Sequence, residues 1–338
     1  MNVSLTQIEA PGTRNLAVRD RVAVLIPCYN EDAAIAKVVS AFRAVLPESA
    51  IYVYDNNSDD HTIEVAREAG ALVRKESLHG KGHVVRRMFA DIEADVYVLV
   101  DGDATYDAPS VRTMIDRLVT ENLDMVVTAR AERDNGAYRL GHRTGNVLLT
   151  GFVRRIFGHT IVDMLSGYRV LSRRFVKSFP VLSGGFEIET ELTVHAIQLG
   201  VPIAEVKTPY YARPSGSHSK LDTCRDGFKI PWMILKLFRS ERPLTFFGGI
   251  GFLLAVASIM LAIPLFATYM EEGLVPRLPT AVLSTGMMLL AFMLVTSGLV
   301  LDTVTRGHRE MKLLAYLAQN TTWQTGISRQ STRSRRYV

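Results

Sequence analysis

The sequence predicts an α/β domain with a mostly parallel, mixed sheet, followed by interfacial helices and a two-helix transmembrane hairpin. Two observations lead to this prediction. Strand-like apolar segments alternate with helix-like segments in the first part of the chain, and two long uncharged apolar segments lie near its C-terminus. The mean hydropathy is +0.12 although 22% of the 338 residues are charged. This combination indicates that the apolar residues are concentrated in one part of the chain.

The alternating segments give the order of the predicted elements. Short apolar runs predict strands at Arg21–Pro27, Ile51–Tyr54, Ala71–Arg74, Val96–Val100 and Asp124–Thr128. Segments with helical periodicity predict helices at Asp32–Leu46, Asp60–Ala69, Lys81–Ile92 and Ser110–Thr120. Strand and helix in alternation favour a parallel sheet covered on both faces. Ligands of such sheets bind beyond the carboxyl ends of the strands.

The apolar segments Leu244–Tyr269 and Pro279–Leu301 carry no charge. Each exceeds the roughly 20 residues that a helix needs to cross a bilayer, so we predict two transmembrane helices. The connecting loop carries Glu271 and Glu272, whereas Lys and Arg flank the outer ends. The positive-inside rule then places the α/β domain and both termini in the cytosol, at the inner (cytoplasmic) membrane. We expect no signal peptide, because charges interrupt the N-terminus before any apolar run.

This reading divides the chain into five parts. They are an N-terminal extension (1–20), the α/β domain (21–221), a juxtamembrane amphipathic helix (222–243), the hairpin (244–301) and a cytosolic basic tail (302–338). A second amphipathic segment, Asn146–Phe157, lies either in the membrane interface or on the sheet. The two cysteines cannot form a disulfide framework, which favours a reducing compartment. Gly248, Gly249 and Gly251 permit close helix contact and are compatible with a homo-oligomer.

Polar clusters follow four of the predicted strands. They are Pro27–Glu31, Asp55–Asp60, His79–Gly82 and Asp101–Asp103. Turns are generally rich in Asn, Asp and Gly, and Asp60 has the alternative role of capping a helix. Because the carboxyl ends of parallel strands meet at one edge, four clusters together indicate a binding site.

The residue types in these clusters suit a nucleotide, a diphosphate and a metal. Asp101 and Asp103 repel each other unless a cation lies between them, and hard oxygen ligands suit Mg²⁺ or Mn²⁺. The alternative is a polar loop with capping carboxylates. Gly80 and Gly82 allow backbone N–H groups to approach an anion, and Lys81 adds charge. Asp55 can accept from a base or ribose, or only stabilise a turn. Walker-loop, GxGxxG, HExxH and GxSxG motifs are absent from the sequence.

With these motifs the chain resembles family 2 glycosyltransferases of the GT-A fold. The matching segments are IPCYNE (Ile26–Glu31), DNNSDDHT (Asp55–Thr62), HGKG (His79–Gly82) and DGDATYD (Asp101–Asp107). More narrowly, it resembles the polyprenyl-phosphate sugar transferases, including the dolichol-phosphate mannose synthase group. Those proteins share the later segments SGYRVLSRR (Ser166–Arg174), GFEIETEL (Gly185–Leu192) and RPSGSHSKL (Arg213–Leu221). The resemblance covers residues 20–240.

The resemblance implies roles for individual residues. Donor-binding roles fall on Pro27, Asn30, Glu31, Asp55, Asn56, Asp60, Lys81 and Gly102. Asp101 and Asp103 would hold the metal and, with Arg169, act in catalysis. Contacts to the acceptor phosphate fall on Arg169, Arg213, Ser219 and Lys220. The sequence departs from the family at His61, His79 and Thr105, so it names neither the third metal ligand nor the sugar.

The implied activity is that of a membrane-bound inverting glycosyltransferase. It would move a sugar from a UDP- or GDP-linked donor to an undecaprenyl or dolichyl phosphate. A lipid monophosphate is already largely anionic at pH 7, so its oxygen can attack without a general base. Glu189 or Glu191 would orient a sugar hydroxyl, or simply lie on a solvated helix face.

Other functions fit the sequence less well. A processive polysaccharide synthase is disfavoured, because there is no QxxRW motif and only two spans are predicted. A different lipid-linked acceptor, or a non-catalytic membrane-anchored sugar-nucleotide-binding protein, stays open. Nucleic-acid binding is disfavoured because the basic residues do not form a known binding motif.

Overall fold

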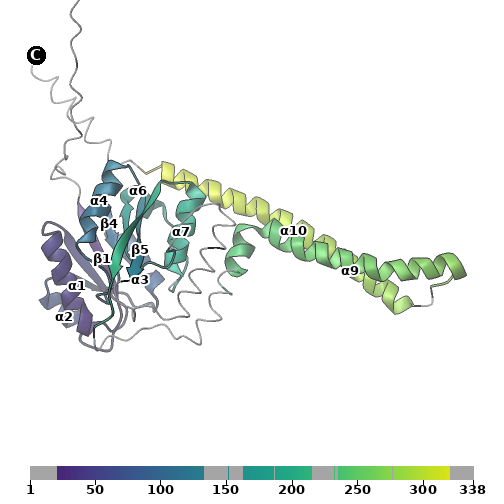
Figure 1. Cartoon of the computed structure of the whole chain (residues 1–338), viewed down its shortest axis with the longest axis horizontal. Helices are drawn as coiled ribbons and strands as arrows, with labels where there is room; N and C mark the ends of the chain where they lie inside the picture. Colours follow the sequence, from purple (N-terminus) through teal and green to yellow (C-terminus); the bar gives the residue numbers. More distant parts are fainter. Residues whose placement is uncertain are drawn as a thin grey trace, which may run out of the picture.

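The computed structural model describes residues 21–132, 151, 163–185, 187–214, 232, 235–275 and 277–319. In this part of the chain an α/β domain carries a long two-helix hairpin that projects away from it (Figure 1). The strands are β1 (Val22–Cys28), β2 (Ala50–Asp55), β3 (Leu72–Lys75), β4 (Val96–Leu99), β5 (Met125–Glu132), β6 (Arg169–Ser172) and β7 (Ile203–Tyr210). The helices are α1 (Asp32–Val45), α2 (Thr62–Glu68), α3 (Lys81–Asp91), α4 (Ser110–Thr120), α6 (Arg173–Ser178), α7 (Ile188–Leu199), α9 (Pro243–Glu272) and α10 (Leu278–Leu317).

The strands form one seven-stranded sheet in the order β3-β2-β1-β4-β6-β5-β7. β6 runs antiparallel to both of its neighbours, β4 and β5, whereas the other pairs are parallel. The predicted mixed, mostly parallel sheet is confirmed, as are the five strands and four helices read from periodicity. The antiparallel insertion of β6 brings the segment before it, which contains Gly167, back to the carboxyl end of β4.

Apolar cores cover both faces of the sheet. In β1, Val24 and Ile26 join one core with α1, α2 and α4, while Ala23 and Leu25 join the other with α3, α6 and α7. This alternation is the period of a strand that is buried on both faces. Because both faces are covered, ligands reach the sheet at its edge, where the loops after β1, β2 and β4 lie.

α9 and α10 are each long and apolar enough to cross a membrane, which agrees with the two predicted spans. Only 11% of the most apolar window of either helix is buried within the protein. The helices cross where Gly251 faces the Ala291 carbonyl, and the Ser258 hydroxyl donates to the Ser284 carbonyl oxygen at 2.6 Å. Gly248 and Gly249 have no other group of the described chain within reach of an added Cβ.

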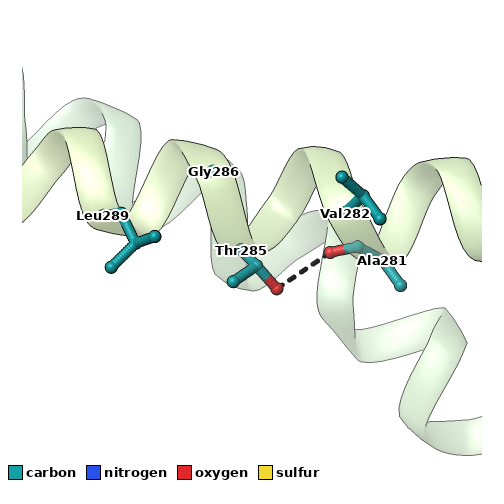
Figure 2. Close-up of a pocket in the computed structure, with 5 residues that line it drawn as sticks. All are labelled: Ala281, Val282, Thr285, Gly286 and Leu289. Atoms are coloured by element: carbon teal, nitrogen blue, oxygen red, sulfur yellow. Dashed lines mark hydrogen bonds between the residues drawn. The ribbon is translucent and has the colours of Figure 1, made fainter.

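A shallow hollow lies along the outer face of α10. Figure 2 shows Ala281, Val282, Thr285, Gly286 and Leu289 along one stretch of that helix. The Thr285 hydroxyl donates to the carbonyl oxygen of Ala281 at 2.9 Å, so its polar group is satisfied inside the helix. The hollow therefore presents apolar surface in the predicted membrane span.

α10 is longer than its predicted span of 279–301. Residues 302–317, expected as the start of a separate tail, continue the helix and pack against α6 and α7 (Figure 1). Burial of Tyr316 in the core beside the sheet explains the extension. Of the expected juxtamembrane helix (222–243), residues 232 and 235–241 are described and helical, Arg242 is not helical, and Pro243 begins α9. Apart from Gly151, the segment Asn146–Phe157 lies outside the described residues.

Candidate active site

The loops after β1 and β2 are joined by hydrogen bonds. The Asn30 N–H donates to the Ser58 hydroxyl at 2.9 Å, and Asn30 Oδ1 accepts from the Asp59 N–H at 2.9 Å. The Glu31 N–H donates to the Thr62 hydroxyl at 2.8 Å. Asn30 adopts a φ of 52°, in the left-handed region that Asn tolerates well. Two of the predicted polar clusters therefore form one continuous wall, which also contains Pro27.

Asp55, the last residue of β2, belongs to this wall and is fully buried. Its Oδ2 accepts from the Ser58 N–H at 3.1 Å. Its Oδ1 is buried without a hydrogen-bond partner in the part of the chain that the structure describes. A buried oxygen without a donor is costly, so a ligand N–H or O–H at this position would stabilise the site. The geometry fits the predicted contact of Asp55 with a base or ribose.

Asn56 and Asp60 have structural partners instead of facing a ligand. The Asn56 amide donates to the carbonyl oxygens of Glu76 and Leu78, and its Oδ1 accepts from the Gly80 N–H at 2.6 Å. The Asp60 carboxylate accepts from the N–H groups of Thr62 and Asp32. Although burial opposes it, these bonds lower the pKa of Asp60. The N-cap position of α2 is His61, so Asp60 is not the helix cap; its bonds to Asp32 and Thr62 join the starts of α1 and α2.

An ion-pair triad with two largely buried side chains, Lys81 and Glu189, lies at the start of α3. Lys81 Nζ contacts the carboxylates of both Asp101 and Glu189. Burial disfavours the charged lysine, but the two carboxylates outweigh it and raise the pKa of Lys81. Burial, together with Asp101, raises the pKa of Glu189 against the influence of Lys81. The solvated-face alternative is therefore wrong for Glu189. Glu191 instead accepts from the N–H groups of Leu182 and Ser183 and holds that loop.

The glycines beside Lys81 serve packing. A Cβ on Gly82 would lie 2.0 Å from the Ser183 carbonyl oxygen, and one on Gly80 would lie 2.0 Å from that of Gly184. The Gly82 N–H donates to the Gly184 carbonyl oxygen at 3.2 Å. The expectation that these glycine amides cradle an anion is wrong for Gly80 and Gly82, because both amides have protein acceptors.

Asp103 forms the second charged group of the site. Its Oδ1 accepts from the Thr105 N–H and hydroxyl at 3.2 and 2.6 Å, and its Oδ2 pairs with Arg213 Nη2 at 2.7 Å. Arg213 also approaches Glu31 Oε1 at 3.7 Å. Burial and the neighbouring Asp101 raise the pKa of Asp103, and Arg213 opposes this.

Close packing fixes the loop between the two aspartates. A Cβ on Gly102 would lie 2.6 Å from Cys28 Sγ, so this position requires glycine for packing. A Cβ on Gly167 would lie 2.2 Å from Asp101 Oδ2. The contact between Gly167 and Asp101 could not be predicted from the sequence, because it depends on the antiparallel pairing of β6 with β4.

Arg169 does not face a ligand. It is fully buried, and its guanidinium donates to the carbonyl oxygens of Ser166, Met164 and Glu189 at 2.8–3.0 Å. It also donates to the Thr193 hydroxyl at 2.9 Å. The predicted contact of Arg169 with an acceptor phosphate is therefore replaced by a structural role, because its donors are used inside the protein. Ser219 and Lys220 lie outside the described residues.

The carboxylates of Asp101 and Asp103 fit a divalent cation. Each now has a cationic partner, Lys81 or Arg213. Burial first, and then repulsion by Asp101, raise the pKa of Asp103, and a cation beside the two carboxylates would oppose both effects. Among the described residues, no group of three or more His, Cys, Asp or Glu is placed so that it could hold a metal ion by itself. A cation here would take its remaining oxygen ligands from a diphosphate and water, as Mg²⁺ commonly does.

The mixed sheet with acidic loops at its strand ends is that of a GT-A nucleotide-sugar transferase. Glucosyl-3-phosphoglycerate synthase from Mycobacterium tuberculosis, in a structure with Mn²⁺, UDP and glucosyl-3-phosphoglycerate, superimposes with a TM-score of 0.54 at 23% identity. The match covers 65% of this chain and 79% of that one, and at this identity it shows the fold alone.

Sequence comparison gives the family. Residues 23–179 match glycosyl transferase family 2. The chain is 35% identical over 293 residues to the glycosyltransferase AglJ of Haloferax volcanii, covering 86% of this chain and 96% of that protein. It is 28% identical over 223 residues to a dolichyl-phosphate hexose transferase of the same organism, covering 66% and 96%. The chain belongs to glycosyltransferase family 2 and is a glycosyltransferase.

Proposed function

We propose that this enzyme transfers a sugar from a UDP- or GDP-linked donor to a polyprenyl phosphate, with inversion at the anomeric carbon. The observation that carries the proposal is a charged strand-end site on a domain joined to two membrane-length apolar helices. An acceptor held in a bilayer explains why both features occur in one chain. The relative named as a dolichyl-phosphate hexose transferase supports this acceptor class.

The donor would bind along the wall formed by Pro27, Asn30, Glu31 and Asp55. The unpartnered Asp55 oxygen would accept from its base or ribose. Asp101 and Asp103 would hold Mg²⁺ or Mn²⁺, which supplies positive charge to the leaving diphosphate. The structural neighbour of the same fold that was crystallised with Mn²⁺ and UDP supports a divalent metal beside a nucleoside diphosphate. Lys81, kept cationic between two carboxylates, adds charge on the same side.

The acceptor phosphate would approach Arg213. The Arg213 side chain is 30% exposed, and its guanidinium already binds a carboxylate oxygen. A phosphate also offers two oxygens to a guanidinium and carries a larger charge, so it competes well for this group. Ser219 and Lys220 would complete the acceptor site. The phosphate is itself the nucleophile, so the enzyme contributes positioning and charge neutralisation instead of proton abstraction.

The hairpin would hold this site at the membrane surface, with the catalytic domain and both termini on the cytosolic side. The basic flanks of the two spans support this orientation. A labelling experiment with a membrane-impermeant thiol reagent tests it. A cysteine placed at Gly273, between the spans, should react from outside intact cells, and one at Arg306 should not. Reversed labelling would overturn the orientation.

The proposed reaction is tested by adding sugar nucleotides one at a time to membranes that contain the enzyme and undecaprenyl phosphate. The mass of the lipid product should equal that of polyprenyl phosphate plus one sugar. Product should disappear with EDTA and return with Mn²⁺ or Mg²⁺. Transfer only to a lipid-linked oligosaccharide, or donor binding without any transfer, would contradict the proposal.

A further inference from the structure

The polar end of α10 lies against the catalytic domain instead of ending at the predicted membrane boundary. Residues 302–317 add about 24 Å of helix at 1.5 Å per residue. The chain enters the hairpin through residues 235–242 ahead of α9, and α10 brings it back to the same domain (Figure 1). The domain is therefore held by the hairpin at two points, and two attachments restrict rotation where one would allow it.

The second attachment is centred on Tyr316. This side chain is 7% exposed and belongs to the core that also contains Phe175 and Phe179. Its hydroxyl donates to Asp124 Oδ2 at 2.6 Å, and the Arg174 guanidinium lies 4.2 Å from the centre of its ring. Tyr316 thus combines apolar burial, a bond to a buried carboxylate and a cation–π contact.

Asp124 connects this contact to the sheet. It directly precedes β5, and its Oδ1 accepts from the hydroxyl of Ser172, the last residue of β6, at 2.6 Å. Its Oδ2 also accepts from Arg174 Nη2 at 2.8 Å. The Tyr316 hydroxyl is therefore bonded to the residue that joins the ends of two neighbouring strands.

A second set of bonds ties α10 to α7. Lys312 Nζ donates to Gln198 Oε1 at 3.0 Å, and the Gln198 amide contacts Glu241, which also binds Arg309. Gln198 lies in the last turn of α7, whereas Glu189, the partner of Lys81, lies in its first turn. α7 therefore extends from the carboxylate that contacts Lys81 to the residue that binds Lys312 of α10.

We infer that Tyr316 is a positioning residue, which fixes the catalytic domain on the membrane hairpin so that the active site meets an acceptor phosphate held in the bilayer. This inference rests on the proposed function in one respect, the membrane-held acceptor. An acceptor free in water needs no such orientation. Comparing the activity of a Tyr316 variant on the two kinds of acceptor therefore distinguishes a positioning role of Tyr316 from a general loss of structure.

The test compares one enzyme on two acceptors. Tyr316→Ala should lower kcat/KM about tenfold for undecaprenyl phosphate in vesicles, because the buried ring, its contact with Arg174 and the hydrogen bond to Asp124 are all lost. Transfer to a short water-soluble prenyl phosphate and the donor KM should stay within about twofold. Tyr316→Phe, which keeps the ring, should show a smaller loss on vesicles. Leu317→Ala, at an exposed position on the same helix end, is the matched control and should change neither activity.

A cross-link distinguishes positioning from folding. In the Tyr316→Ala background, Gln198→Cys and Lys312→Cys joined by a short bis-maleimide should restore vesicle activity to within about twofold of wild type. Each single cysteine is the control. Equal loss on both acceptors, unchanged vesicle activity in Tyr316→Ala, or no rescue by the cross-link would overturn the inference alone. Absence of transfer to any polyprenyl phosphate by the wild-type enzyme would overturn the proposed function as well.

Discussion

The strand-end site and the region beneath the end of α10 both contain charged groups. The charged groups of the two regions differ in their exposure to solvent and in their hydrogen-bond partners. In the site, two ion pairs each keep one partner in contact with solvent: Asp101 is 28% exposed beside Lys81 at 9%, and Arg213 is 30% exposed beside Asp103 at 7%. In the region beneath α10, Asp124 is 1% exposed and accepts from Ser172, Arg174 and Tyr316. Charges that keep contact with solvent can exchange partners when a ligand arrives, whereas fully satisfied buried charges hold the fold. The difference separates groups that act on ligands from groups that support them.

The strongest test of this comparison removes a carboxylate from the site. Asp103→Ala should reduce sugar transfer about 100- to 1,000-fold, because charge stabilisation at the leaving diphosphate is lost. The melting temperature and membrane insertion should change little. Radiolabelled transfer and thermal unfolding in detergent measure the two effects. Asp116→Ala, on an exposed position of α4, is the control. Full activity of Asp103→Ala would contradict the metal assignment.

Arg169 tests the other side of the comparison. Arg169→Ala leaves several buried carbonyl oxygens without donors and a cavity behind, so the free energy of unfolding should fall by about 3 kcal/mol. The acceptor KM of the remaining folded enzyme should stay within about twofold. Arg213→Ala should do the reverse, raising the acceptor KM with little loss of stability. A stable Arg169→Ala enzyme with a raised acceptor KM would restore the role that the sequence predicted.

Gly82 tests whether the glycines serve packing. Gly82→Ala places a methyl group against the Ser183 carbonyl and should destabilise the protein by about 2 kcal/mol. Gly151→Ala, where an added Cβ meets nothing of the described chain within 4 Å, is the control. Thermal unfolding measures both. Unchanged stability in Gly82→Ala, combined with weaker nucleotide binding measured by calorimetry, would favour the anion-cradle interpretation instead.

His195 gives the smallest effect, on the pH dependence of stability. It packs against Phe175 and Phe179, and burial, with a smaller contribution from Lys312, lowers its pKa to about 3. The unfolded chain binds this proton below about pH 6.5, so the stabilisation is present above that pH and is lost as the pH falls toward 3. Between pH 7 and 5 the loss should be about 1–2 kcal/mol.

His195→Phe should reduce that loss of stability on acidification, because phenylalanine cannot take up the proton. Melting temperatures at pH 7 and pH 5 give the measurement. His308→Gln, at an exposed position of α10, is the control and should behave as wild type. An unchanged pH dependence in His195→Phe would show that other groups dominate the acid sensitivity.

The sequence determined the features that depend on neighbouring residues. Alternation of apolar runs fixed five strands and four helices, because each element must match the period of a buried face. The strand-end clusters and the two membrane-length spans follow from the same local patterns. Family motifs added the later segments, for which periodicity gave no strand or helix.

Only the tertiary structure decided which charged groups meet. Arg169 and Arg213 were assigned to the same phosphate, yet β6 buries Arg169 against backbone carbonyls and the end of β7 leads Arg213 to Asp103. Glu189 contacts Lys81, and Tyr316 contacts Asp124, although more than a hundred residues of sequence separate the members of each pair. Such contacts depend on strand order and helix docking, which no local period encodes. The residue types of the site were therefore readable from the sequence, and their division into ligand-facing and supporting groups was not.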